Sequence, residues 1–184
     1  MLKRTVRICS AVPLVVACLL SGSLAALADK TIQYQQFVGP SERFTLEYPK
    51  KDWRIIPGGG AVLVTIAEKN SDAVVIVERA RLNLELAREE ITDVFAQNEA
   101  DVARERRPGA TGVNARVIDN GTLRFILLQY TQPGTKGAER VREYSFPIGT
   151  DLYRLICTAP ADQFDKFEPI FGHIATTFRA RRTP

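Results

Sequence analysis

The chain has 184 residues with 25 basic and 21 acidic side chains, and its formal net charge is +4 with its single histidine neutral. Residues 1–28 hold three of the basic side chains and none of the acidic ones, so the remainder carries 22 against 21. A near-neutral remainder lacks the broad cationic field of nucleic-acid-binding proteins, so we expect no nucleic acid partner.

The first 28 residues have the pattern of a secretory signal peptide. Three basic residues fall within the first seven, an apolar stretch follows over 8–20, and small residues lead to an A-x-A site formed by Ala26 and Ala28. Cleavage after Ala28 makes Asp29 the first residue of the mature protein. We therefore expect export to the periplasm or to an extracytoplasmic membrane surface.

Cys18 gives this segment a second interpretation. The preceding Val15-Val16-Ala17 forms a loose lipobox, in which Cys18 would carry a lipid. More apolar residues follow Cys18, which favours cleavage after Ala28, and the apolar stretch is short for an uncleaved membrane anchor. The sequence leaves open whether the protein is released after Ala28 or tethered at Cys18.

One domain is expected over 42–178. Residues 29–41 are polar with scattered aromatic side chains and are expected to be a lead-in segment, and 179–184 form a basic tail. The length of the central segment suits a single hydrophobic core.

The domain opens on a strand with clear alternation. Phe44, Leu46 and Tyr48 alternate with polar residues, and Pro49 ends the run. Trp53 begins a second apolar stretch. These spacings predict two short strands.

Hairpins and one helix follow along the chain. The triple glycine at 58–60 predicts a hairpin loop, and 61–67 with 73–77 predicts an antiparallel hairpin near the centre of a sheet. A helix is expected over 87–106, closed by Pro108. Its predicted apolar face contains Ile91, Val94, Phe95 and Val102.

Strands return after this helix. Asn120-Gly121 predicts a hairpin turn with positive φ at both positions, 132–137 predicts a flexible loop, and a second hairpin is expected over 139–158. A last helix carries phenylalanines at three- and four-residue spacing, with Pro169 predicting a kink or break. Local hairpins with two helices indicate an α+β fold, in which helices cover the faces of a central, mainly antiparallel sheet.

Histidine and cysteine are too few for the common catalytic and metal sites. His173 is the only histidine, Cys157 is the only cysteine after residue 28, and the chain has no G-x-S-x-G, H-E-x-x-H or C-x-x-C motif. Cys157 lies in an apolar run that predicts a buried structural thiol, and His173 is expected to be a packed or surface side chain. We therefore expect no enzyme activity, no metal and no cofactor.

The opening motif resembles a known family. Phe44-x-Leu46-x-Tyr48-Pro49-x-x-x-Trp53 is similar to the signature of the PsbP-like superfamily, which includes the bacterial DcrB-type envelope proteins and the Mog proteins. Tyr130, the pair Arg142-x-Tyr144 and the closing Thr177-Phe178 follow in the family's order. The resemblance covers about 42–178. It implies that Phe44, Tyr48, Pro49 and Trp53 are structural, with the aromatic side chains packed under the sheet.

The resemblance implies an α/β/α sandwich used for protein binding rather than catalysis. We expect an exported, non-catalytic accessory protein that binds a partner protein or membrane-bound complex at a membrane surface. The alternative is an envelope protein that binds a small ligand or lipid, with or without a lipid anchor. The basic segments 104–107 and 179–184 are candidate contacts for an acidic partner or a membrane surface, and ordinary solvated charge is the alternative.

Overall fold

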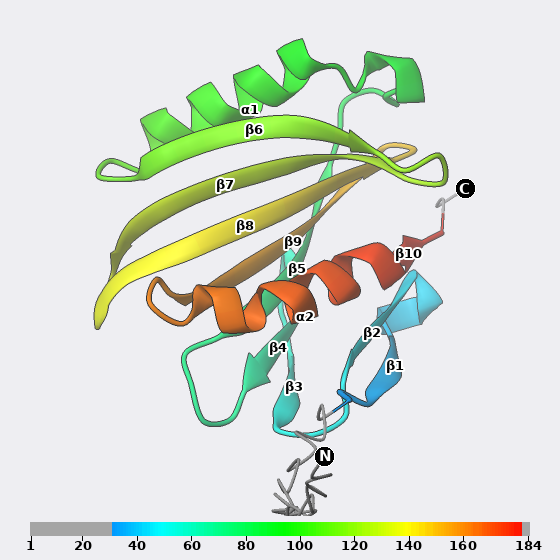
Figure 1. The fold of residues 1–184 in the computed structure, drawn as a ribbon. Coiled ribbons are helices and arrows are strands. Elements are labelled where there is room, and N and C mark those ends of the chain that lie inside the picture. The colour runs from blue at the N-terminus through cyan, green and yellow to red at the C-terminus, as the bar shows by residue number, and fades with distance from the viewer. Residues whose placement is uncertain (1–30, 182–184) are drawn as a thin grey trace, which may run out of the picture. The chain divides into compact units, whose positions relative to one another are not determined.

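A seven-stranded antiparallel sheet is the centre of the domain in the computed structural model, which describes residues 31–181. Its strand order is β3-β4-β5-β9-β8-β7-β6, and every neighbouring pair is antiparallel (Figure 1). The strands are β3 (Trp53–Pro57), β4 (Val62–Glu68), β5 (Val74–Arg81), β6 (Thr111–Asp119), β7 (Arg124–Gly134), β8 (Gly137–Ile148) and β9 (Asp151–Pro160). The predicted antiparallel sheet is confirmed, and the signal-peptide features lie outside the described residues.

Two helices cover opposite faces of this sheet. They are α1 (Asp93–Arg106) and α2 (Phe164–Thr177). Side chains alternate along β9, so that Tyr153 and Leu155 pack with α2 while Ile156 packs with the cluster under α1. This arrangement is the predicted helix–sheet–helix sandwich.

A small second sheet extends the domain beyond the expected 42–178. Its order is β1-β2-β10, formed by β1 (Tyr34–Val38), β2 (Phe44–Pro49) and β10 (Arg179–Ala180), with a 3₁₀ turn at Pro40–Glu42. β1 lies in the segment expected to be a lead-in, and β10 lies in the expected basic tail. The sequence pattern did not predict these two strands because their segments are polar. Pairing to β2 uses backbone groups and needs no apolar side chain on the outer face.

The predicted apolar face of α1 is wrong at Val94 and Val102, whereas Ile91, which lies just before the helix, is buried and the half-buried Phe95 packs against the same cluster. After a 3₁₀ turn at Arg88–Glu90, the helix begins at Asp93, where the Thr92 hydroxyl accepts a hydrogen bond from the Phe95 N–H at 3.3 Å. Val94 is 71% exposed, and the residues that face the sheet are alanines. Small side chains let the helix approach the sheet closely, which leaves the bulkier valines outside. The buried alanines are Ala96, Ala100 and Ala103.

Pro169 does not divide the last helix. α2 runs as one helix over Phe164–Thr177 with Pro169 inside it. The apolar stripe on both sides of the proline is buried, including Phe167 and Ile174. Burial of this stripe offsets the backbone hydrogen bond that a proline removes.

Two turns also differ from expectation. The loop after β6 is four residues long, and among its residues only Gly121 has positive φ, at 84°. The Asn120 side-chain oxygen accepts hydrogen bonds from the N–H groups of Thr122 and Leu123, which sets this wider turn. The expected flexible loop at 132–137 is a tight hairpin, since β7 and β8 stay paired as far as Gly134 and Gly137.

The signature residues lie in or against the core between the sheet and α2. Phe44 is 1% exposed, and its ring packs against those of Tyr153 and Phe178 at centroid distances of 6.2 and 5.7 Å. Trp53 is buried edge-on against Phe167. Two further signature positions lie at the end of β2, where Tyr48 is half-buried and Pro49 is buried.

Replacing Trp53 with alanine should lower the free energy of unfolding by about 3–5 kcal/mol, because it opens a cavity against α2. The matched control is Ile56→Ala on the same strand, since Ile56 is 38% exposed. Chemical denaturation of both variants measures the difference. Equal losses for the two variants would contradict the packing role of Trp53.

Candidate functional site

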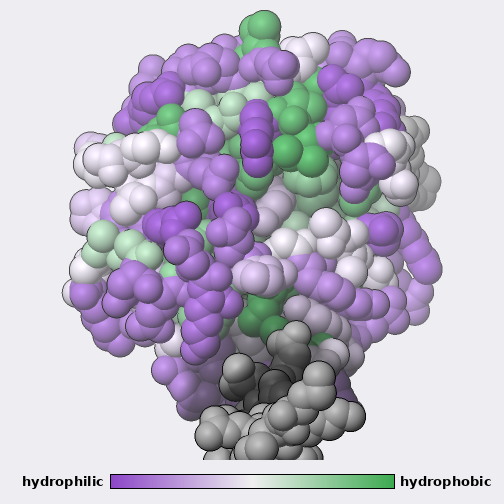
Figure 2. Space-filling model, viewed as in Figure 1, coloured by the Kyte–Doolittle hydropathy of each residue, from purple (hydrophilic) through white to green (hydrophobic). Residues whose placement is uncertain are grey.

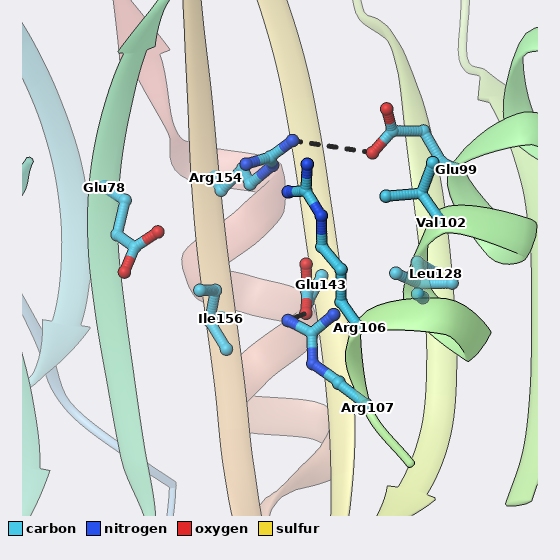
Figure 3. A pocket seen from close by; sticks show the side chains of 10 residues that line it. Glu78, Glu99, Val102, Arg106, Arg107, Leu128, Glu143, Arg154 and Ile156 are labelled. Carbon is cyan, nitrogen blue, oxygen red and sulfur yellow. Dashed lines mark hydrogen bonds and ion pairs between the residues drawn. The ribbon is translucent and has the colours of Figure 1, made fainter. Parts of the chain in front are cut away.

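A charged pocket lies between α1 and the sheet, and we name it the α1 pocket. Its volume is about 290 Å³, and its walls come from α1 on one side and from β5, β7, β8 and β9 on the other (Figure 3). Six of its ten lining residues are charged, so it does not have the chemistry of an apolar lipid cavity. The lining residues are Glu78, Glu99, Val102, Ala103, Arg106, Arg107, Leu128, Glu143, Arg154 and Ile156.

A buried carboxylate fixes the floor of the α1 pocket. Glu143 is 4% exposed, and it accepts hydrogen bonds from the Arg107 guanidinium at 2.7 Å and the Tyr130 hydroxyl at 2.6 Å. The Arg107 guanidinium also lies 4.8 Å from the centre of the Tyr130 ring. Burial raises the pKa of Tyr130, and the Glu143 carboxylate raises it further. Tyr130 therefore remains a neutral hydrogen-bond donor to a charged acceptor.

A second ion pair crosses the mouth of the pocket. Arg154 on β9 reaches Glu99 on α1 at 3.5 Å, as the dashed line in Figure 3 shows. Glu78 is the cross-strand neighbour of Arg154, yet no ion pair joins them. Arg106 and Glu78 are left without a hydrogen bond or ion pair within residues 31–181.

A second pocket, which we name the end pocket, lies where three connections meet at one end of the sheet. Its volume is about 250 Å³. Its walls come from the segment before α1, the β6–β7 turn and the β8–β9 turn. Six of its ten lining residues are apolar, and Figure 2 shows hydrophobic surface above α2 on this face of the domain. The apolar lining residues are Leu86, Ile91, Leu123, Phe146, Pro147 and Ile148.

Two arginines line the end pocket and share one carboxylate. Asp119 accepts from Arg88 at 2.6 Å and from Arg124 at 3.0 Å, and Arg124 also donates to the Ile91 carbonyl at 2.9 Å. The Gly121 N–H, followed by these two guanidinium groups, holds the pKa of Asp119 below its ordinary value. The two arginines and Asp119 together therefore carry one net positive charge beside the apolar residues of the end pocket.

Comparison with known proteins rests on solved structures, because neither a protein-family model nor a curated protein matches the chain. Cyanobacterial PsbP (CyanoP) from Synechocystis superposes with a TM-score of 0.61 at 15% identity, covering 84% of this chain and 96% of that one. LpqN, involved in cell envelope biogenesis of Mycobacterium tuberculosis, superposes with a TM-score of 0.56 at 16% identity, covering 85% and 94%. The domain has the PsbP-like fold.

A third match is to part of a larger protein. A structure from Bacteroides thetaiotaomicron superposes with a TM-score of 0.59 at 15% identity, covering 82% of this chain and 50% of that one. At these identities the likeness concerns the fold alone. The side chains that line the two pockets therefore have to be interpreted on their own chemistry.

The single histidine is partnered by a residue that is far from it in the sequence. His173 Nε2 lies 2.9 Å from a carboxylate oxygen of Glu47 on β2, and its ring stacks on Tyr34 of β1 with centroids 3.6 Å apart. Acids nearer in sequence pair elsewhere, Asp165 with Arg140 and Glu168 with Arg142. This position agrees with the expectation of a packed or surface histidine, since the His173 side chain is 33% exposed.

The cysteine has the predicted position. Cys157 is free and fully buried, and burial raises its pKa, which keeps the thiol protonated and unreactive.

Within residues 31–181, no group of three or more histidine, cysteine, aspartate or glutamate side chains is placed to hold a metal ion. In the same part of the chain, no helix is both long and apolar enough to span a membrane.

Apart from Arg106, the described arginines of the basic segments have internal partners. Arg104 pairs with Asp101 and donates to the Val113 carbonyl at 2.8 Å, while Arg181 pairs with Glu42 at 3.4 Å. Arg104 and Arg181 are therefore engaged within the domain, and residues 182–184 of the tail lie outside the described part.

Sequence reasoning did not find the α1 pocket. Its one local signal was Glu143, a carboxylate at an inward position of a long strand.

Two buried tyrosines should respond oppositely to loss of their hydroxyl groups. Tyr130→Phe should lower the free energy of unfolding by about 1–3 kcal/mol, because Glu143 loses a hydrogen-bond donor. Tyr153 is also buried, and its hydroxyl has no hydrogen-bond partner within the described residues. Tyr153→Phe should therefore raise the free energy of unfolding by about 1 kcal/mol. Denaturant titration measures both, and shifts of the same sign would contradict the assignment.

Proposed function

We propose that this protein is an exported, non-catalytic accessory domain that binds a partner protein at an extracytoplasmic membrane surface. The observation that carries the proposal is the end pocket, in which six apolar residues lie beside two arginines that share one carboxylate. Apolar pockets edged by charge are typical sites for anchoring side chains of a protein partner.

The partner's chemistry follows from the pocket. Leu86, Ile91 and Ile148 offer an apolar lining for an aliphatic or aromatic side chain. Arg88 and Arg124 leave one positive charge after pairing with Asp119, so a carboxylate next to that anchor is favoured. We therefore expect a partner segment with an apolar anchor flanked by an acidic residue.

The chemistry of the described residues supports binding rather than catalysis. His173 is engaged with Glu47 and stacked on Tyr34, and Cys157 is buried. Neither side chain adjoins the α1 pocket or the end pocket. An activated nucleophile needs a base within hydrogen-bond reach and access to substrate.

Export is supported by the signal-peptide pattern of residues 1–28, and a protein with the same fold has a described role in the cell envelope. LpqN, one of the solved structures with this fold, is described as involved in cell envelope biogenesis. That description concerns LpqN, and the export of this chain rests on its own N-terminal sequence.

Binding of a partner at the end pocket is tested by substituting two leucines of the same loop, one inside the pocket and one outside it. Leu86→Glu places a charge in the end pocket, whereas Leu84→Glu places it two residues away on a side chain that is 57% exposed and outside the pocket. A membrane-fraction partner captured by the wild type should be retained by Leu84→Glu and lost by Leu86→Glu. Both variants should keep the wild-type melting temperature within a few degrees. Equal capture by the two variants would exclude the end pocket as the docking site.

Processing of the exported chain is tested by intact mass. Cleavage after Ala28 yields a protein that begins at Asp29, and Ala28→Leu should accumulate the uncleaved precursor. A lipidated product that begins at Cys18, abolished by Cys18→Ala, would instead establish a tethered form. Recovery of the full-length chain from the cytoplasm would contradict export.

A further inference from the structure

Two opposite charges of the α1 pocket lack partners within residues 31–181. Arg106 lies in the last turn of α1, and Glu78 lies on β5 across the pocket. The other four charged side chains of the pocket are engaged in the two ion pairs described above. The pocket is therefore neutral as a whole but carries one uncompensated charge of each sign, on opposite sides (Figure 3).

The positive charge belongs to a group of guanidiniums. Figure 3 shows Arg106 reaching from α1 toward the sheet, and Arg107 and Arg154 line the same pocket. Glu99 and Glu143 neutralise two of these three arginines. Guanidinium groups bind phosphate and carboxylate through paired N–H donors, so the remaining charge favours an oxyanion.

The negative charge of Glu78 stays unpaired within the described part of the chain because the Arg154 side chain points away from it. Glu78 and Arg154 are neighbours across β5 and β9, but Arg154 turns toward Glu99 on α1. Glu78 is half-buried and accepts no hydrogen bond from the described residues. A carboxylate in this environment gains from a cationic hydrogen-bond donor supplied by a ligand.

We propose that the α1 pocket binds a small zwitterion. Its phosphate or carboxylate group lies against Arg106 and Arg154, and its ammonium group donates to Glu78. Leu128 and Ile156 provide the apolar surface for the short carbon chain between the two charges. A soluble zwitterion and the phosphoethanolamine headgroup of a lipid share this chemistry. The site is separate from the end pocket, so either proposal can fail without the other.

Calorimetric titration of the full chain tests the pairing of the two charges. O-Phosphoethanolamine should bind at least about tenfold more tightly than inorganic phosphate or ethanolamine alone, because each of these engages only one side of the pocket. Arg106→Gln and Glu78→Gln should each weaken binding of O-phosphoethanolamine by about tenfold or more.

The matched control is Arg104→Gln on the same helix. Arg104 is engaged with Asp101 and the Val113 carbonyl and does not line the pocket, so its variant should bind as the wild type does. Melting temperatures of the three variants establish that each is folded. The proposal is overturned if no O-phosphoethanolamine binds, if phosphate alone binds as tightly, or if Glu78→Gln has no effect.

Vesicles separate the two sources of the headgroup. Phosphatidylglycerol vesicles with and without phosphatidylethanolamine are compared for binding of the wild type and Arg106→Gln, so that contributions of the N-terminal segment cancel. A phosphatidylethanolamine-dependent gain that Arg106→Gln removes identifies the lipid headgroup as ligand. Binding of free O-phosphoethanolamine without this gain identifies a soluble zwitterion. If the wild type shows neither, the zwitterion site is excluded.

Discussion

The alternation of side chains along β9 is the constraint on which the rest of the domain depends. β9 lies between β5 and β8, so every side chain it carries must enter one of two layers. Tyr153 and Leu155 enter the aromatic core under α2, while Arg154 and Ile156 face the side of α1. A slip of one residue in this strand would exchange the two sets and place a guanidinium among phenylalanine rings.

The two helices use this sheet in different ways. α2 buries phenylalanines and closes a continuous apolar core, whereas α1 contributes alanines and approaches the sheet along β6 and β7. Because α1 lies over β6 and β7, room remains beside it for charged side chains from β5, β8 and β9. A buried carboxylate such as Glu143 is tolerable there because both Arg107 and Tyr130 donate to it.

The PsbP-like fold explains the scaffold but not its use. Structures that share it at 15–16% identity preserve the layers and the order of elements, while function depends on the side chains at particular sites. In this domain those sites are an apolar pocket lined by arginines and a neutral pocket with separated charges. Both are suited to holding a ligand or partner, and the described residues around them place no activated nucleophile there.

The sequence by itself determined the elements whose signal is local. Alternation predicted β2, and apolar runs between turns predicted strands of the large sheet. The spacing of phenylalanines predicted α2, the apolar run around Cys157 predicted its burial, and the motif from Phe44 to Trp53 indicated the fold. Only the tertiary structure decided that alanines rather than valines of α1 face the sheet, because that depends on how closely the helix approaches. It also decided the charge pairs, since His173 and Glu47 lie 126 residues apart and meet only through packing. Local periodicity describes one element at a time, whereas a pocket is made by the register between several.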